Sequence, residues 1–545
     1  MMSQQQRDVF ADGCRRQVPT AKMVPTASFG AGLALGAMFF ALACGAAEVD
    51  FRKPGIVPEP KEMTYQANVP VRIVNETVFA VTAPDEAAAK WVADKAKLWF
   101  GVTPKVSFAE GPAAVDPKAL DPLNEEYELV AEPGRISLRA KTLKGVKYAM
   151  HTLRQVAERE SVGVKLKNYW LPALKVKDRP DLAFRGVHFC FMPEMTPTLI
   201  EHQIRAAAYL KFNFAVIENW GVFKGERNPD FCVPNAPLTV AEAKRLTAIA
   251  DDLGLTLVPQ INIFGHASLE RGCAAKHSTI DYRPEYQPLF EPCGGWNWCL
   301  SNPDARAKLR DLVAELHEAF GNPPFFHIGC DEAAPPSCPT CRAVKPYAKL
   351  VERHITEVAA MLRKRGARAM MWHDMLLEKG GKWKPFYANG DADEAKMVDT
   401  LPKDIVICDW YYGSDGGGSD PTGGTVVTNG YPTLDYFRGK GRDVLTCPWR
   451  NEKGIMAQGA YARKHGMFGL LETVWHHYSG TEFQRMMETA SNAAWGDGKR
   501  HVEFWTQPGL FHTFWRQVGW DMGIKDHNET GFFGKQVTRD IGGGN

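Results

Sequence analysis

The chain has no marked excess of charge of either sign. Its 545 residues include 65 Lys and Arg against 63 Asp and Glu, a formal net charge of +2, and no long basic run stands out. Nucleic acids are bound mainly through clustered positive charge, so this balance argues against a nucleic-acid partner.

Long apolar runs are also scarce, with one exception near the N-terminus. Arg15, Arg16 and Lys22 precede an apolar run over 29–44, and small residues follow it up to Ala47. This order is typical of a secretory signal, and the run is short for a membrane span. We therefore predict a signal segment over 1–47 and export to the periplasm, cell surface or medium. A lipid anchor at Cys44 is the alternative to cleavage after Ala47, and no other stretch is predicted to span a membrane.

Patterns that bind metals or cofactors are few. The 12 cysteines include one C-x-x-C pair, Cys338 and Cys341, which suits half a zinc site, a loop disulfide or two free thiols. A four-ligand zinc site would need a second half, and Cys273, Cys293 and Cys299 lie in one long loop where they could pair with one another. We predict no metal and no cofactor.

The region over 48–178 mixes strand and helix patterns. The segment 69–81 is rich in β-branched residues, and 126–130 and 135–140 flank a Pro-Gly turn typical of a hairpin. Helical spacing follows over 85–100 and 143–157. We predict a small α+β domain without a cluster of catalytic residue types, which we interpret as a support for the rest.

Strands and helices alternate over 179–480. Eight strands are predicted: Phe184–Cys190, Phe214–Glu218, Thr256–Asn262, Phe325–Cys330, Ala369–His373, Ile405–Trp410, Asp443–Cys447 and Met467–Val474. Helices are predicted between most of them: Thr198–Leu210, Val240–Leu253, Ala305–Phe320, Tyr347–Arg365 and Gly454–His465. This alternation predicts an α/β fold, a (β/α)8 TIM barrel. The alternative is an open doubly wound sheet, and the lack of a Gly-rich phosphate loop after the first strand argues against its nucleotide-binding form.

Two adjacent acids stand at the end of the fourth predicted strand. The apolar stretch 323–330 leads directly into Asp331 and Glu332. A barrel enzyme carries its catalytic groups at the C-terminal ends of its strands, so this pair is a catalytic candidate. A solvated helix start is the alternative, because acids favour the first turn of a helix.

Tryptophans recur at the ends of the predicted strands. Trp372, Trp410 and Trp475 each lie at or just after one. Barrel interiors prefer branched aliphatic residues, whereas indole rings beside acids suit the apolar face of a sugar ring. The alternative is that each Trp fills a gap between strand and helix.

The stretch from Phe326 to Glu332 reads FHIGCDE, and it is accompanied by FRGV, VPQINIFGHA and LDY elsewhere in the barrel region. Together these motifs resemble glycoside hydrolase family 20, the β-N-acetylhexosaminidases. FHIGCDE resembles the family's H-x-G-G-D-E motif, with Cys330 in place of the second Gly. FRGV over 184–187, VPQINIFGHA over 258–267 and LDY over 434–436 resemble further family segments, and IVPEP over 56–60 and the helix over 143–156 resemble its N-terminal domain.

The resemblance implies retaining hydrolysis in which the 2-acetamido oxygen of the substrate is the nucleophile. Glu332 would be the general acid and base, with a raised pKa, and Asp331 would orient the acetamido group and stabilise the oxazolinium ion. The implied partners are glycans that carry N-acetylhexosamine. The residues implied to bind this sugar are Arg185, His266, Trp372, Trp410, Asp435 and Trp475.

The chain departs from the family pattern around the sugar. Gln260 and Asn262 replace the two acids of P-E-I-D, Thr433 stands where a Tyr is usual, and His477 replaces the acid of the final W-x-E. These changes leave the acid pair intact and alter the expected recognition residues.

Two other functions stay open. A metal-dependent barrel hydrolase would use histidines near strand ends, namely His188, His266, His327 and His373, although no H-x-H follows the first strand. A catalytically altered glycan-binding protein would explain the changed recognition residues. The remaining segment, 481–545, is predicted to be a helical extension with a possible part in a homodimer.

Overall fold

The computed structural model describes residues 51, 53–159, 169–268, 279–292, 294–413, 430–475, 480–497, 515, 518 and 519. The predicted signal segment over 1–47, Cys273 and Cys293 lie outside these residues. Residues 49–545 form one compact unit.

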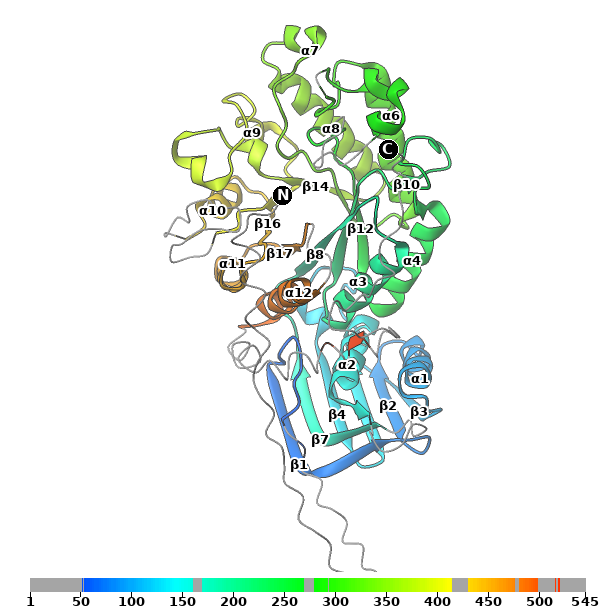
Figure 1. Ribbon diagram of the computed structural model, residues 1–545. Coiled ribbons are helices and arrows are strands. Elements are labelled where there is room, and N and C mark those ends of the chain that lie inside the picture. The colour runs from blue at the N-terminus through cyan, green and yellow to red at the C-terminus, as the bar shows by residue number, and fades with distance from the viewer. Residues whose placement is uncertain are drawn as a thin grey trace, which may run out of the picture. The chain divides into compact units, whose positions relative to one another are not determined.

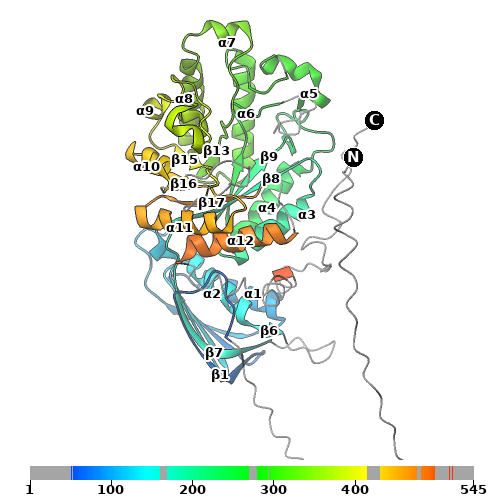
Figure 2. The same ribbon diagram turned by 60° about the vertical axis from the view of Figure 1, so that its left-hand side comes forward.

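The N-terminal region is a mixed sheet with helices on one side. Its strands run in the order β1-β7-β4-β5-β2-β3, and β6 pairs with β7. The elements are β1 (Glu62–Ile73), β2 (Val78–Ala83), α1 (Ala87–Phe100), β3 (Lys105–Glu110), η3 (Pro122–Glu125), β4 (Tyr127–Glu132), β5 (Arg135–Ala140), α2 (Leu143–Val156), β6 (Glu158–Arg159) and β7 (Tyr169–Asp178). Helices α1 and α2 lie between this sheet and the barrel (Figures 1 and 2).

The predicted hairpin and both predicted helices of this region are confirmed. Strands β4 and β5 pair antiparallel around Gly134, whose φ of 78° suits a tight turn. Helix α2 begins where the Thr142 hydroxyl accepts a hydrogen bond from the backbone N–H of Gly145. The single strand predicted over 69–81 is wrong in one respect, because a turn divides it between β1 and β2.

The eight predicted parallel strands close into a barrel, which confirms the predicted fold class. The circular order is β12-β13-β14-β15-β16-β17-β8-β9. The strands are β8 (Phe184–Phe191), β9 (Phe214–Asn219), β12 (Thr256–Gln260), β13 (Phe325–His327), β14 (Arg368–Trp372), β15 (Val406–Asp409), β16 (Val444–Thr446) and β17 (Gly469–Thr473). The open doubly wound sheet is thereby excluded.

Helices surround the barrel, and short elements fill its loops. The longer helices are α3 (Pro197–Tyr209), α4 (Val240–Leu253), α6 (Pro303–Ala319), α8 (Ala348–Lys364), α10 (Pro432–Gly439), α11 (Glu452–His465) and α12 (Gly480–Trp495). The short elements are β10 (Phe223–Lys224), β11 (Leu238–Thr239), α5 (Thr279–Tyr282), η4 (Pro284–Leu289), α7 (Pro339–Ala343), η5 (Asp374–Leu376), η6 (Gly381–Phe386) and α9 (Met397–Thr400).

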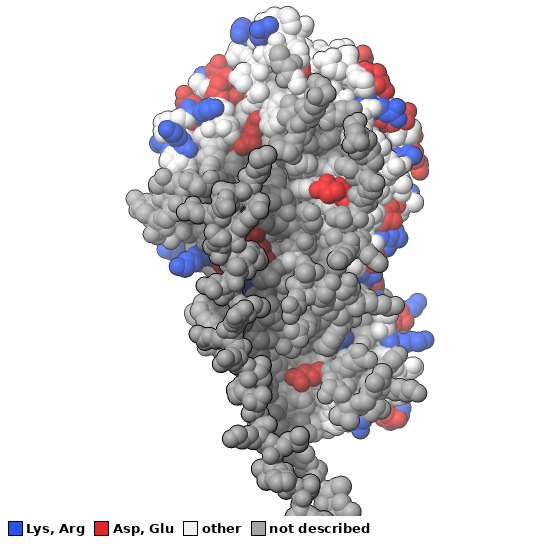
Figure 3. Space-filling view, in the orientation of Figure 1, with Lys and Arg blue, Asp and Glu red and all other residues white. Residues whose placement is uncertain are grey.

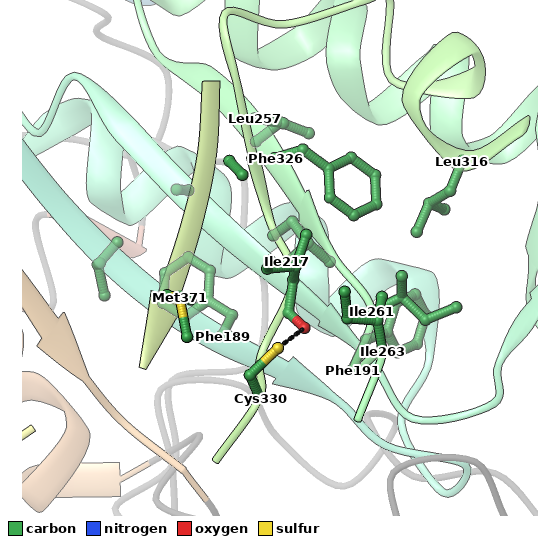
Figure 4. Close-up of a cluster of buried hydrophobic side chains, with 14 of the residues drawn as sticks. Phe189, Phe191, Ile217, Leu257, Ile261, Ile263, Leu316, Phe326, Cys330 and Met371 are labelled. Atoms are coloured by element: carbon green, nitrogen blue, oxygen red, sulfur yellow. Dashed lines mark hydrogen bonds between the residues drawn. The ribbon is translucent and has the colours of Figure 1, made fainter. Parts of the chain in front are cut away.

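Two apolar layers hold the barrel together, one inside it and one between strands and helices. The inner layer includes Phe184, Phe214 and Phe325, with Phe184 and Phe214 stacked 4.4 Å apart. The outer layer packs strand residues such as Ile217 and Phe326 against Leu316 of α6 (Figure 4). This alternation of inward and outward side chains is the pattern of a closed parallel barrel.

Two observations concern apolar helices and surface charge. Among the described residues, no helix combines the length and apolarity needed to cross a membrane. On the visible described face, acidic and basic side chains are interspersed (Figure 3).

Candidate active site

The acid pair follows β13 on a strained turn. Gly329, Cys330 and Glu332 have positive φ values of 66°, 75° and 46°. A Cβ at Gly329 would collide with the Asn262 side chain, so glycine is required there. Positive φ at the non-glycine residues costs backbone energy, and such strain concentrates at functional sites.

Cys330, which replaces a family glycine, points away from the site. Its side chain is fully buried in the outer apolar layer, and its thiol donates to the carbonyl of Ile328 at 3.5 Å (Figure 4). Burial raises the pKa of this thiol well above its usual value. The thiol therefore stays protonated and contributes packing to the turn.

Asp331 is buried and held in place. Its carboxylate accepts a hydrogen bond of 2.7 Å from Nδ2 of Asn262, and its other oxygen lies 3.5 Å from Nε2 of His266. The loop that carries His266 packs closely against Asp331. A Cβ added at Gly265 would collide with the carbonyl oxygen of Asp331, so only glycine permits this approach. This environment fixes the orientation of the Asp331 side chain.

Glu332 has a clamped backbone and an open side chain. Its N–H donates to Oδ2 of Asp374 at 2.8 Å, and its carbonyl oxygen accepts from Nε1 of Trp296 at 2.7 Å. The side chain is 48% exposed, and its carboxylate lies 2.9 Å from Nε2 of His266. Of the two acids, Glu332 is thus the one that can exchange protons with a bound molecule and with water.

Asp374 organises one side of this site. Besides the Glu332 N–H, its carboxylate accepts hydrogen bonds of 3.1 Å from Nε1 of Trp410 and from Nδ2 of Asn389. Burial, and secondarily the charge of Asp331, raise the pKa of Asp374 to about 6. Asp374 follows β14, so its hydrogen bond with the Glu332 N–H joins the loops after two neighbouring strands.

Two of the three predicted tryptophans, Trp410 and Trp475, form a partly exposed aromatic border. Trp410 stacks on Tyr387 with a centroid distance of 4.7 Å and an interplanar angle of 12°. Nε1 of Trp475 donates to the hydroxyl of Tyr412 at 2.8 Å. Both indoles are partly exposed. Tyr412 follows the sixth predicted strand directly after Trp410 and Tyr411, whereas Tyr387 was not identified from the sequence.

Trp372 has a different position from the one expected. It ends β14, has no exposed surface, and packs on His327 at 4.4 Å and on Trp475 at 5.7 Å. The structure therefore places Trp372 in the buried interior and not beside the exposed Glu332 side chain, and its contact with the sugar stays a prediction. The ring lies within the barrel interior and packs against Trp475.

Arg185, predicted to bind the sugar, is not brought to the acid pair. Arg185 is the second residue of β8, so it lies at the end of the barrel opposite the acid pair. Its guanidinium is buried, with Nη2 2.5 Å from Oε2 of Glu125 and 3.0 Å from the hydroxyl of Tyr148. It joins the barrel to the N-terminal region.

Asp435 is likewise not brought to the acid pair. It lies in the first turn of α10 and is about half exposed. Its carboxylate accepts a hydrogen bond of 2.6 Å from the hydroxyl of Tyr461 and lies 3.8 Å from Nδ1 of His465, both on α11. These contacts place it in the helical layer, and the prediction that it contacts the sugar stays a prediction.

Two groups of side chains within the described residues could hold a metal ion. One is His188, Cys190 and Glu218, and the other contains Glu291 and three cysteines. In the first group Glu218 already accepts hydrogen bonds from Nε1 of Trp220 and the thiol of Cys190. Protein donors therefore already satisfy this buried carboxylate. The four histidines of the metal-dependent alternative form no joint group in this part of the chain.

Comparison with known proteins matches the chain to one family. The family model described as glycosyl hydrolase family 20, domain 2, matches residues 53–179. The model described as glycosyl hydrolase family 20, catalytic domain, matches residues 222–437, and the two together cover more than half of the chain. The chain belongs to glycoside hydrolase family 20.

Curated relatives and solved structures agree with this membership of family 20. A β-N-acetylhexosaminidase of Cellulomonas fimi is 25% identical over 352 residues, 59% of this chain and 66% of that protein. A β-hexosaminidase of Vibrio furnissii is 23% identical over 52% of this chain and 48% of its own length. The chain thus spans less than two thirds of the length of each of these relatives.

The solved structures show the family 20 fold. The exo-β-N-acetylglucosaminidase of Vibrio harveyi superposes with a TM-score of 0.62 at 16% identity, covering 87% of this chain and 79% of that one. The β-N-acetylhexosaminidase of Bacteroides fragilis gives a TM-score of 0.62 at 16% identity, covering 87% and 99%.

Proposed function

We propose that the protein is a β-N-acetylhexosaminidase, a glycoside hydrolase that removes terminal N-acetyl-β-hexosamine from glycans. The observation that carries this proposal is the division of roles within the acid pair. Asp331 is buried and oriented by Asn262, whereas the Glu332 carboxylate is open and its backbone is clamped. Adjacent carboxylates suit a glycosidase whose nucleophile belongs to the substrate, because the protein then need not place acids on both faces of the sugar.

The proposed reaction retains configuration and proceeds through an oxazolinium intermediate. The acetamido oxygen attacks the anomeric carbon while Glu332 gives its proton to the leaving glycosidic oxygen. Asp331 accepts a hydrogen bond from the acetamido N–H and balances the positive charge of the intermediate. Water then attacks the anomeric carbon and opens the oxazolinium ring, while Glu332 takes a proton from that water. This step restores both the protonated Glu332 and the acetamido group.

The aromatic border supplies the sugar-binding surface in this proposal. Trp410 and Trp475 are partly exposed and are each held by a hydrogen bond, to Asp374 and to Tyr412. Fixed indoles bind the apolar face of a pyranose with little loss of side-chain entropy. His266, within reach of both acids, is placed to contact the substrate and the proton-carrying oxygen of Glu332.

Substitution of the acid tests the proposal. We expect Glu332→Gln to lower kcat on an aryl N-acetyl-β-glucosaminide or galactosaminide by about 10²- to 10⁴-fold, because general acid–base catalysis contributes that much. Glu357→Gln, an exposed glutamate on α8, is the control and should keep wild-type turnover. Steady-state kinetics on both sugars measures the effect.

A second substrate distinguishes the substrate-assisted mechanism from glycosidase activity in general. The wild-type enzyme should turn over the N-acetyl glycoside and leave the matching aryl β-glucoside, which lacks the amide, essentially uncleaved. Equal cleavage of both would contradict substrate assistance, while the Glu332→Gln result would still report on the acid.

A glycan-binding protein without turnover is the second candidate. Arg185 and Asp435 do not reach the site, and amides stand at Gln260 and Asn262 where the family has acids. Calorimetric binding of N-acetylhexosamines by the wild-type protein, with no turnover of any such glycoside, would favour this function.

We further propose export, directed by the segment over 1–47, so that the enzyme meets glycans outside the cytoplasm. Cell fractionation and N-terminal sequencing of the mature protein test it and distinguish cleavage from a lipid anchor at Cys44. A homodimer stays a prediction, which light scattering measures.

A further inference from the structure

A second cluster of reactive side chains lies beside the acid-pair loop. Glu291 and Cys299 come from the long connection after β12, and Cys338 and Cys341 come from the loop after β13. One potential ligand atom from each of these four residues lies within 4.8 Å of all the others. The second half that the lone C-x-x-C pair lacked in the sequence is therefore supplied by a different loop.

The separations of the sulfur atoms suit a shared metal ion. Sγ of Cys299 lies 3.7 Å from Sγ of Cys338 and 3.9 Å from Sγ of Cys341. Four ligands placed tetrahedrally around zinc at Zn–S distances of about 2.3 Å leave neighbouring sulfurs about 3.8 Å apart. A disulfide would require about 2.05 Å, and all three cysteines are free in the structure.

The surroundings of the four groups are arranged for negative charge. The backbone N–H of Cys341 donates to Sγ of Cys338 at 3.2 Å. Oε2 of Glu291 accepts from the backbone N–H groups of Ser337 and Cys338 at 2.8 and 2.6 Å. Its other oxygen, Oε1, is buried and has no hydrogen-bond partner in the described part of the chain. Outer hydrogen bonds of this kind orient metal ligands.

We propose that Glu291, Cys299, Cys338 and Cys341 bind one structural zinc ion. Thiolates favour zinc over the hard cations magnesium and calcium. Four protein ligands fill a tetrahedral site and leave no position for water or substrate, which is the arrangement of a structural site.

The ion would join the two loops that hold the catalytic acid. Between them, Trp296 donates to the carbonyl of Glu332, and the Asn297 side chain bonds both the N–H and the carbonyl of Ala334. Cys299 is three residues from Trp296, and Cys338 is six residues from Glu332. A role of the ion in holding the catalytic acid rests on the proposed function, whereas the binding of the ion itself does not.

Metal analysis of the purified full-length protein tests the site. We expect about one zinc ion per chain by elemental mass spectrometry after removal of free metal. Cobalt substitution should give thiolate-to-cobalt charge-transfer absorption in the near ultraviolet. Cys341→Ser and Glu291→Gln should each lower the bound zinc, and Cys232→Ser, a buried cysteine outside the cluster, should retain it.

A measurement on the wild-type protein guards against variants that fail to fold. Titration with an organomercurial thiol reagent should release the zinc, detected with a metal-binding dye, in step with modification of three cysteines. Wild-type protein that carries no zinc and takes up no cobalt would overturn the proposal. So would an intact mass showing a disulfide among Cys299, Cys338 and Cys341. None of these readouts depends on glycosidase turnover.

Discussion

At the scale of single residues, Asp374 connects the catalytic acid to the aromatic border. One buried carboxylate accepts hydrogen bonds from the Glu332 backbone and from the Trp410 indole. A shift of this side chain would move both groups relative to a bound sugar. Asp374 is therefore a positioning residue in the proposed mechanism, since it acts through the groups it holds.

We expect Asp374→Asn to lower kcat by about 10²-fold, since displacement of a catalytic group by 1 Å costs roughly that much. The pKa of Asp374, raised from 3.8 to about 6, means that its carboxylate is ionised only above about pH 6. An acid limb near pH 6 in the wild-type rate profile should be absent in the variant. An unchanged pH profile together with unchanged kcat would refute the positioning role.

At the scale of elements, the buried side chain of His354 connects helix α8 to the loop after β12. Strand β12 is the neighbour of β13, which the acid pair follows. His354 on α8 lies 3.1 Å through Nε2 from the carbonyl oxygen of Ile263, which follows β12. Burial lowers the pKa of His354 from 6.5 to about 4. The folded protein therefore holds this imidazole neutral.

This shift predicts a specific pH dependence of stability. Between about pH 6.5 and 4 the unfolded chain binds the proton and the folded chain does not, so His354 makes the folded state less stable as pH falls. His354→Gln retains an amide donor for Ile263 and does not titrate. Relative to its value at pH 7, the unfolding free energy of the variant should gain about 3 kcal/mol on the wild type by pH 4.

Denaturant unfolding at several pH values measures this difference. His465→Gln, a partly exposed histidine on α11, serves as the control. A constant difference between wild type and His354→Gln across this range would contradict the prediction.

At the scale of the whole molecule, the N-terminal region and the barrel share buried polar contacts. Asp178 at the end of β7 accepts hydrogen bonds from Tyr127 and from Nε1 of Trp495, the last residue of α12. Lys211, which follows α3, donates to the same Tyr127 hydroxyl at 2.8 Å. These contacts attach the N-terminal region to the end of the barrel opposite the acid pair.

Arg185 belongs to this junction, and its replacement should affect stability and not substrate binding. Arg185→Met leaves Glu125 buried with Lys144 3.5 Å away as its remaining ion-pair partner. Loss of one partner of a buried pair costs about 3–5 kcal/mol. We expect urea unfolding to show this loss while KM stays at the wild-type value.

Arg139→Met, an exposed arginine on β5, is the matched control and should leave both quantities unchanged. A raised KM at full stability would instead restore Arg185 as a sugar-binding residue.

Much of this architecture follows from local pattern. Alternating strands and helices predicted the barrel, and the acids after 325–330 marked its catalytic end, because parallel strands all present their C-terminal ends on one side. The same rule explains why the structure does not bring Arg185 to the acid pair. Arg185 stands at the start of its strand, so its side chain belongs to the opposite end, whatever motif surrounds it.

Periodicity and contiguous motifs were enough to predict the succession of strands, the position of the adjacent acids and the family. Contacts between distant side chains became visible only in the folded chain: Asp374 with Glu332, Arg185 with Glu125, and Cys299 with Cys338 and Cys341. Such pairs come from different loops, and loop paths are set by packing over the whole barrel, which no local pattern encodes.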